Sequence, residues 1–371
     1  MKVLIISYTD LKNDPRPYRQ IKSIYKSTEV HTVGTSESGL EKSFTRLKKN
    51  NFIIRTFRIL LLKFKLYDYY NWDFYKKKIL SEKNKIKYDL VIAHEVRLVP
   101  LAIKLAKEAP VVLDAHEYSP KNFDDSWLWR FFIKKYYTYL CDKYLPIVDK
   151  VITVSRGIVN AYKENYNIKP ILITNACEYK ENIAPQKINK NKIRIIHHGI
   201  ASSSRKLELL IDMMNYLDDK YELNFMLVSS TYSKLYLNKL KRRVKNKNIK
   251  FLQPVSREKL IYLSNDYDIG IHFVPPTNYN LKYGLGNKFF EYVQSRLVIA
   301  IGPDIEMSRY VKKYNLGIIS KTWDPSSIAE AIMNTDLNTL NFYKNQCHIF
   351  AKELSSNQND EVFLNLVNSY K

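Results

Sequence analysis

Short runs of apolar residues recur along the chain, and each run is followed by a segment with helical spacing. Five runs lie in the first half, at residues 3–7, 90–93, 111–114, 151–154 and 171–173. Between them, segments such as 99–107 and 158–164 carry apolar residues at positions i, i+3 and i+4. Apolar strands that alternate with amphipathic helices are typical of a parallel sheet covered on both faces.

The same alternation starts again in the second half, at residues 193–197, 225–228, 249–252, 269–273, 298–301 and 317–319. We therefore expect an α/β protein of two doubly wound, Rossmann-like domains that face a central cleft, because ligands of such sheets bind at the carboxyl ends of the strands. The expected parts are a first domain at 1–177, a polar linker at 178–192, a second domain at 193–345 and a C-terminal helix at 346–371 that crosses back to the first domain.

Composition excludes several classes of protein. A chain of 371 residues suits two domains, and its 9 glycines form neither a G-x-G-x-x-G nor a P-loop pattern, which excludes the usual dinucleotide and P-loop sites. The three cysteines are widely spaced, so we expect neither a disulfide framework nor a cysteine-rich zinc site. The chain has no signal-peptide pattern and no apolar run of membrane-spanning length, which favours a soluble or peripheral protein of the cytosol.

The net charge of +23, from 60 basic and 37 acidic residues, has two explanations. One is genome composition, since AT-rich codons would give the heavy use of Lys, Asn, Ile and Tyr. The other is an anionic partner: nucleic acid, anionic membrane or a phosphorylated substrate. The charge is concentrated in residues 46–88, where thirteen Lys and Arg residues stand against three acidic ones and alternate with aromatic residues. This pattern fits an interfacial membrane element and a solvated basic face over an ordinary core equally well, with single-stranded nucleic acid ranked third. The aromatic segment 127–137 fits core packing by default, or the rim of the same membrane surface.

Residues 283–302 combine a glycine loop, a helix that begins near Asn287 and a buried strand. A loop with Gly284 and Gly286 that leads into a helix offers free backbone N–H groups and a positive dipole end, which suit a diphosphate. Lys288 adds a charge, and Glu291, one turn further on, can accept hydrogen bonds from ribose hydroxyls. The plain alternative is an ordinary helix with a surface glutamate.

This segment resembles the donor-site motif of the family 4 glycosyltransferases, which have the GT-B fold and retain the anomeric configuration. Glu291 matches the second of the motif's two glutamates, whereas Tyr283 replaces the first. Six further segments resemble the subgroup with a D-A-H-E sequence and occur in the family order: 13–19, 88–95, 114–117, 149–155, 175–176 and 199–210.

The resemblance implies a role for particular residues. Arg205 and Lys206 would neutralise the leaving diphosphate, which makes a metal unnecessary, and His116 would contact the donor sugar or support positive charge at the anomeric carbon. The implied donor-binding residues are Gly199, Tyr283, Gly284, Leu285, Gly286, Asn287, Lys288 and Glu291. The implied acceptor-binding residues are Arg16, Arg19, His94, Glu95 and Glu117.

The resemblance thus implies a retaining, metal-independent glycosyltransferase without a cofactor. It would move a sugar from a nucleoside-diphosphate donor to a lipid-linked or oligosaccharide acceptor in bacterial surface polysaccharide (capsule or lipopolysaccharide) biosynthesis, on the cytoplasmic face of an anionic membrane and without nucleic acid. Two alternatives remain open: a nucleotide-sugar 2-epimerase on the same fold, and a basic membrane- or nucleic-acid-binding protein whose active site has decayed.

Overall fold

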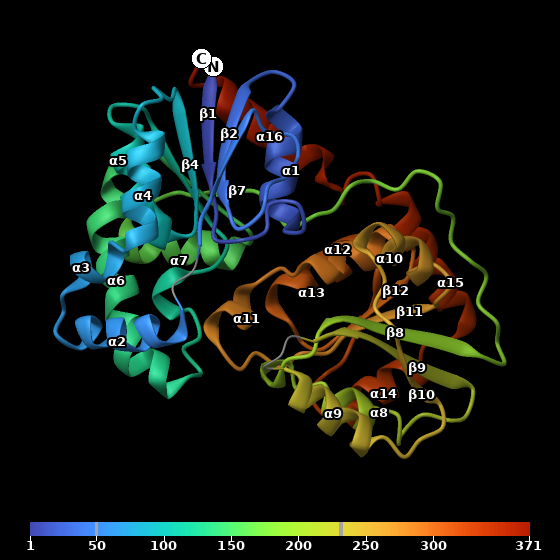
Figure 1. The fold of residues 1–371 in the computed structure, drawn as a ribbon. Coiled ribbons are helices and arrows are strands. Elements are labelled where there is room, and N and C mark those ends of the chain that lie inside the picture. Colours follow the sequence, from blue (N-terminus) through green and yellow to red (C-terminus); the bar gives the residue numbers. More distant parts are fainter. Residues whose placement is uncertain (49–50, 230–232) are drawn as a thin grey trace. The chain divides into compact units, whose positions relative to one another are not determined.

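The computed structural model describes residues 1–48, 51–229 and 233–371 and divides into two compact units. Unit 1 consists of residues 1–174, 278–284 and 358–371, and unit 2 consists of residues 175–277 and 285–357. Each unit is built around one parallel sheet (Figure 1). Lys49, one of the basic residues noted above, lies outside the described residues.

The sheet of unit 1 has seven strands in the order β3-β2-β1-β4-β5-β6-β7, all of them parallel. Their bounds are β1 Lys2–Ile6, β2 Glu29–Gly34, β3 Ser43–Arg46, β4 Leu90–His94, β5 Val111–Ala115, β6 Lys150–Thr153 and β7 Ile171–Leu172. The chain builds outwards from β1 on one side, then returns to β4 on the other. The strand order therefore reverses between β1 and β4.

The helices of unit 1 are α1 Pro15–Ile24, α2 Phe52–Lys63, α3 Tyr67–Asn71, α4 Phe74–Lys83, α5 Val99–Ala106, α6 Lys134–Tyr144, α7 Arg156–Tyr166, α11 Tyr279–Tyr283 and α16 Ser356–Asn368. Short helical turns complete it: η1 Val96–Leu98, η2 Ser119–Lys121, η3 Trp129–Ile133 and η4 Leu145–Ile147. Side chains cap several of them; Asp14 and Ser155, for example, accept backbone N–H bonds at the starts of α1 and α7.

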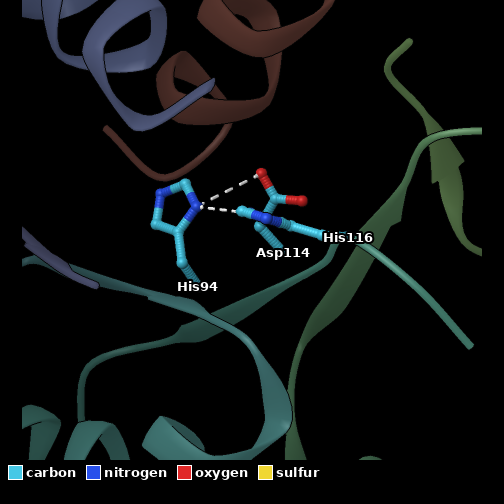
Figure 2. Close-up of side chains that lie close together, drawn as sticks. All are labelled: His94, Asp114 and His116. Atoms are coloured by element: carbon cyan, nitrogen blue, oxygen red, sulfur yellow. Dashed lines mark hydrogen bonds and ion pairs between the residues drawn. The ribbon is translucent and has the colours of Figure 1, made fainter. Parts of the chain in front are cut away.

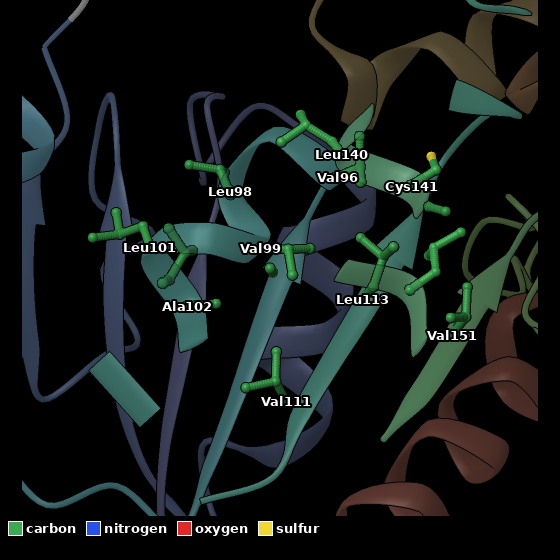
Figure 3. Packing of buried hydrophobic residues seen from close by; sticks show 14 of the residues in the cluster. Val96, Leu98, Val99, Leu101, Ala102, Val111, Leu113, Leu140, Cys141 and Val151 are labelled. Atoms are coloured by element: carbon green, nitrogen blue, oxygen red, sulfur yellow. The ribbon is translucent and has the colours of Figure 1, made fainter. Parts of the chain in front are cut away.

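Alternate residues of each strand in unit 1 enter different cores. Leu4 and Ile6 face a core with α5, α6 and α7, whereas Val3 and Ile5 face a core with α1 and α16. Figure 3 shows part of the first core, which contains Val99 and Ala102 of α5 and Leu113 of β5. Both faces of the sheet are thus covered, as continuous apolar strands require.

The sheet of unit 2 has six parallel strands in the order β10-β9-β8-β11-β12-β13, and the order reverses between β8 and β11. Their bounds are β8 Ile193–Ile200, β9 Tyr221–Val228, β10 Ile249–Leu252, β11 Ile269–His272, β12 Val298–Ile301 and β13 Gly317–Ile319. The helices are η5 Ser203–Arg205, α8 Glu208–Met213, α9 Lys234–Arg243, α10 Arg257–Ser264, α12 Asn287–Gln294, α13 Ile305–Tyr314, α14 Pro325–Met333 and α15 Leu337–Ile349. α8, α9 and α14 cover one face, and α10, α12 and α13 cover the other.

The prediction of two doubly wound parallel sheets is confirmed, and all eleven predicted strands are present. β2 and β3 were missed. β2 contains His31 and Thr32, two buried polar residues that break the apolar run, and β3 is a short edge strand. Residues 278–284 differ from the expected division: the second domain was expected to contain them, but they belong to unit 1, where the Asn280 side chain accepts a hydrogen bond from the backbone of Tyr118.

The two aromatic regions are divided between core and surface. Leu62 and Ile79 enter the core of unit 1, while Ile53, Phe57 and Leu60 of α2 are more than half exposed. In the second region Trp129, Tyr136 and Tyr137 are buried, and Trp127, Leu128 and Phe131 are exposed. Neither a purely solvated basic face nor complete core packing describes them. Across the described ranges, none of the helices has both the length and the apolar character needed to cross a bilayer.

Candidate active site

In each unit, polar side chains gather where the strand order of its own sheet reverses, at the carboxyl ends of the central strands. Ligands of open α/β sheets bind at such positions, because the flanking loops separate there and leave a crevice. In unit 2 the central strands are β8 and β11, and in unit 1 they are β1 and β4.

Two cations of unit 2 lie over one glycine at the end of β8. Gly199 has a φ of +126°, a backbone conformation that side chains rarely adopt. A Cβ placed there would lie 2.8 Å from Nζ of Lys288 and 3.3 Å from Nη1 of Arg205. Arg205 also donates to the carbonyl of Ile200 at 3.2 Å. Only glycine therefore leaves room for both charges above this strand end.

Lys288 comes from the first turn of α12, a helix whose N-cap residue is Gly286 and has no side chain to offer its first N–H groups. The lysine is only 9% exposed. Burial, followed by the Arg205 charge, lowers the pKa of Lys288 to about 7, although Glu291 acts against this. A bound anion would relieve the repulsion between the two cations.

Glu291 lies one turn further along α12 and is 8% exposed. Its carboxylate is 3.8 Å from Nε2 of His198 and 3.9 Å from Nε of Arg257, which begins α10. The glutamate is thus positioned near the same strand end as Lys288 and Arg205, where the sequence predicted donor binding.

Three histidines line the ends of β8 and β11 in unit 2. Burial and the Lys288 charge lower the pKa of His198 to about 3, and lower the pKa values of His197 and His272 well below the ordinary value. All three are therefore neutral at pH 7. Nδ1 of His197 donates to the carbonyl of Ile271 at 2.9 Å, while Nε2 of His197 and of His198 and Nδ1 of His272 are buried without a hydrogen-bond partner among the described residues. The positive charge of this site thus comes from Lys288 and Arg205.

The site of unit 1 is organised by the carboxylate of Asp114, which is completely buried on β5. Arg16 of α1 donates to both of its oxygens at 2.8–3.0 Å, and the Gln20 amide donates to Oδ2. Burial is the largest single influence and would raise the pKa of Asp114, but the Arg16 charge, the two neighbouring histidines and the Arg16 hydrogen bonds together outweigh it and hold that pKa well below the ordinary value. The carboxylate therefore stays ionised.

Two histidines adjoin this carboxylate, as Figure 2 shows. Nδ1 of His94, at the end of β4, is 2.9 Å from Nε2 of His116 and 3.8 Å from Oδ2 of Asp114. The three ligand atoms lie within 4.8 Å of one another, a spacing that a metal ion requires. However, Arg16 and Gln20 already occupy the carboxylate, and the guanidinium would repel a cation. The geometry fits a hydrogen-bonded network better than a metal site.

Arg16 and His94, two of the expected acceptor residues, are buried. Arg16 is 4% exposed and spans Asp114 and the carbonyl of Ile173, and His94 has no exposed surface. Their side chains form hydrogen bonds with Asp114 and His116 in the interior of unit 1. The other expected acceptor residues are accessible: Glu117 is exposed, Arg19 is partly buried, and Glu95 is paired with Arg97 at 2.6 Å.

The remaining predicted residues fall into two groups. Gly199, Arg205, Gly286, Asn287, Lys288 and Glu291 belong to unit 2 around the ends of β8 and α12. Tyr283 and Gly284 belong to unit 1, where the Tyr283 carbonyl accepts a hydrogen bond from Ser155. Leu285 is buried, so only its backbone is available, and Lys206 is exposed in the left-handed conformation with a φ of +50°.

Sequence reasoning missed Gln20, His272 and Arg257. Gln20 stands four residues after Arg16, a helical spacing that could have linked the two. His272 ends a predicted strand, as His94 does, and was open to the same argument. Arg257 stands in a loop-to-helix segment with no signal of its own.

The comparisons with known proteins agree with this architecture. The sequence model described as Glycosyltransferase Family 4 matches residues 28–176. No curated protein matches the chain. Solved structures are similar over the whole chain. HepE from Anabaena, solved in complex with UDP and glucose, has a TM-score of 0.73 and 12% identity, and the match covers 100% of both chains. Sucrose-phosphate synthase from Thermosynechococcus elongatus has a TM-score of 0.75 and 12% identity, and the match covers 100% of this chain and 98% of that one. A trehalose-phosphate synthase from Burkholderia vietnamiensis is also similar (TM-score 0.68, 12% identity, 100% of both chains). The fold is therefore GT-B, as the resemblance implied.

The Asp114 network predicts acid-sensitive stability. Asp114→Asn should lower the free energy of unfolding at pH 7 by about 3–5 kcal/mol, because Arg16 is left buried without its counter-charge. The folded-state pKa of Asp114 lies below its unfolded value, so its contribution is present above pH ~4 and is lost as the pH falls further. In urea unfolding, the difference in free energy of unfolding between wild type and Asp114→Asn should be smaller at pH 3 than at pH 7. Asp142→Asn, at an exposed position of the same unit, is the control, and an equal loss in both variants would contradict the argument.

Proposed function

We propose that the protein is a retaining glycosyltransferase of family 4 that uses a nucleoside-diphosphate sugar. The observation that carries the proposal is the convergence of Lys288 and Arg205 over Gly199. Two cations crowded at one strand end are unfavourable unless an anion separates them, and a diphosphate supplies two adjacent negative groups. The family match to residues 28–176 and the GT-B fold support the same reading.

The proposed reaction needs little from the protein beyond charge and orientation. The bond between the anomeric carbon and the diphosphate oxygen breaks, the acceptor oxygen bonds to the same face of that carbon, and its proton passes to the leaving diphosphate. Lys288 and Arg205 stabilise the charge that builds on the diphosphate, which takes the part that a divalent metal plays elsewhere. Glu291 holds the ribose hydroxyls, and His116 meets the donor sugar. Tyr283 and Lys206 remain candidates for the sugar and the phosphate.

For the acceptor we propose a lipid-linked glycan of a bacterial surface polysaccharide, met at an anionic membrane. The support is an apolar stripe on α2: Ile53, Phe57, Leu60 and Phe64, spaced by four, three and four residues, are 66%, 69%, 52% and 68% exposed. α2 contacts η3, which adds exposed Phe131. Among the described residues, exposed cations that belong to or adjoin these two elements are Lys63, Lys65, Arg130, Lys134 and Lys135. Exposed apolar side chains ringed by Lys and Arg are typical of interfacial membrane helices.

Nucleotide binding tests the donor site. In a thermal-shift screen of UDP, GDP, CMP and their sugars, one nucleotide at 100 times its Kd should stabilise the protein by about 2.7 kcal/mol. Arg205→Ala and Lys288→Met should each weaken that nucleotide by at least about tenfold, because a charge-assisted hydrogen bond contributes about 1.5–3 kcal/mol. Arg242→Ala, at an exposed position of α9, should bind as wild type does. If no nucleotide shifts the melting temperature, the assignment of the donor site is wrong.

Product analysis with donor alone separates transfer from epimerisation, since only an epimerase converts the donor without an acceptor.

The pKa of Lys288 predicts the pH dependence of nucleotide binding. Above pH 7 the free protein loses the Lys288 charge, so binding must take up a proton and the Kd should rise by up to about tenfold per pH unit from pH 7.5 to 9. The terminal phosphate of the nucleotide is already ionised in this range. Lys288→Arg keeps its charge and should remove the dependence. A wild-type Kd that is flat over this range would contradict the assignment.

Vesicle binding tests the membrane surface. Ile53→Ser, Phe57→Ser and Leu60→Ser combined should weaken binding to phosphatidylserine-containing vesicles by at least about tenfold, because each side chain loses apolar burial in the interface. The matched control changes three exposed apolar residues of unit 2: Leu235→Ser, Phe342→Ser and Ile349→Ser. Nucleotide affinity should stay unchanged in both. Equal vesicle binding by the two triple variants would rule out the α2–η3 surface.

A further inference from the structure

The contact between His94 and His116 places one constraint on both rings. The nitrogens that meet, Nδ1 of His94 and Nε2 of His116, are 2.9 Å apart, so one must carry the proton and the other must accept it. His94 is completely buried, and its Nε2 has no partner among the described residues. His116 is partly exposed.

Burial and the surrounding charges decide which ring donates. Burial lowers the pKa of His94 to about 4, so this ring is neutral at pH 7 and carries a single proton. Its Nδ1 lies 3.8 Å from the ionised carboxylate of Asp114. A proton on Nδ1 is attracted to that carboxylate, whereas a lone pair there would be repelled by it. A proton on Nε2 would instead be a buried donor without an acceptor, which costs about 1–3 kcal/mol.

We propose that His94 is a positioning residue that donates from Nδ1 to Nε2 of His116 and so holds the His116 ring in the Nδ1–H tautomer. Nε2 of His116 is then occupied, and Nδ1–H is the one group the ring presents. His116 becomes a hydrogen-bond donor of fixed orientation, suited to a sugar hydroxyl or ring oxygen and unsuited to removing a proton through Nε2. That the partner is a donor sugar rests on the proposed function, whereas the tautomer does not.

Asp114 fixes the direction of the pair without touching a ligand. Arg16 and Gln20 keep its carboxylate ionised and in place, and its charge then biases the His94 proton. Arg16 and Gln20 of α1 thus act on Asp114 of β5, which acts on His94 of β4. These four residues are buried, and His116 is the partly exposed residue of the network that a substrate can reach. This arrangement resembles in logic the carboxylate that orients a catalytic histidine in hydrolases.

The first test measures the tautomer in the unchanged protein. In ¹⁵N-histidine-labelled wild-type protein, with His116 assigned by its loss in His116→Gln, long-range ¹H–¹⁵N spectra should show Nδ1 protonated and Nε2 unprotonated at pH 7. An Nε2–H tautomer of His116 would overturn the proposal, whatever the enzyme transfers.

Two variants then separate positioning from packing. His94→Leu fills a similar volume but cannot donate, so His116 should lose its single tautomer and kcat/KM should fall by about tenfold, mainly through kcat. His94→Asn can place an amide N–H near the position of Nδ1 and should restore both the tautomer and most of the activity. Nucleotide affinity should stay the same in both variants. If His94→Leu keeps the Nδ1–H tautomer, His94 only packs; if the tautomers behave as expected but no sugar is transferred, the proposed function fails and the positioning role stands.

Discussion

Parallel pairing of every strand determines where this protein can carry out chemistry. All strands of a sheet end at the same edge, so loops that start far apart in the sequence deliver their side chains to one place. Both sheets also need apolar residues on both faces, which leaves the strand interiors unable to hold free polar groups. Polar residues are therefore concentrated at or just past the strand ends, as His94, His116 and His272 show.

The two units treat buried charge in opposite ways. In unit 1 the Asp114 carboxylate is paired within the protein by Arg16, so its charge is compensated before any ligand arrives. In unit 2 Lys288 and Arg205 repel each other, and Glu291 compensates only in part. A charge that is paired within the protein can orient a neighbouring side chain, whereas a charge that is not fully compensated can bind an oppositely charged ligand. The same chain thus contains a positioning site and an anion site that differ in how far folding alone satisfies them.

Much of the fold was visible in the sequence, because buried parallel strands are uninterrupted apolar runs; β2 was hidden because His31 and Thr32 interrupt its run. The meeting of Gly199, Arg205 and Lys288 at one strand end was predictable in outline, since residues that follow parallel strands converge at one edge of the sheet. What the sequence could not give was the partner of each side chain. Arg16 and His94 stand where a ligand residue would stand, and only their contacts with Asp114 and His116 assign them an internal role. Likewise, nothing in the run around Tyr283 indicates that it packs in unit 1.

The position of α16 in the sequence has a consequence for folding during translation. This helix follows unit 2 in the chain, yet it lies beside α1 in unit 1 (Figure 1). There Phe363 and Val367 complete the core that contains Val3 and Ile5. During translation the face of the first sheet that α16 covers therefore stays open while the whole of unit 2 is made. Unit 2 has its own complete sheet and can fold on the ribosome before unit 1 is finished. The open apolar face is then the part of the nascent chain most exposed to aggregation and to chaperones.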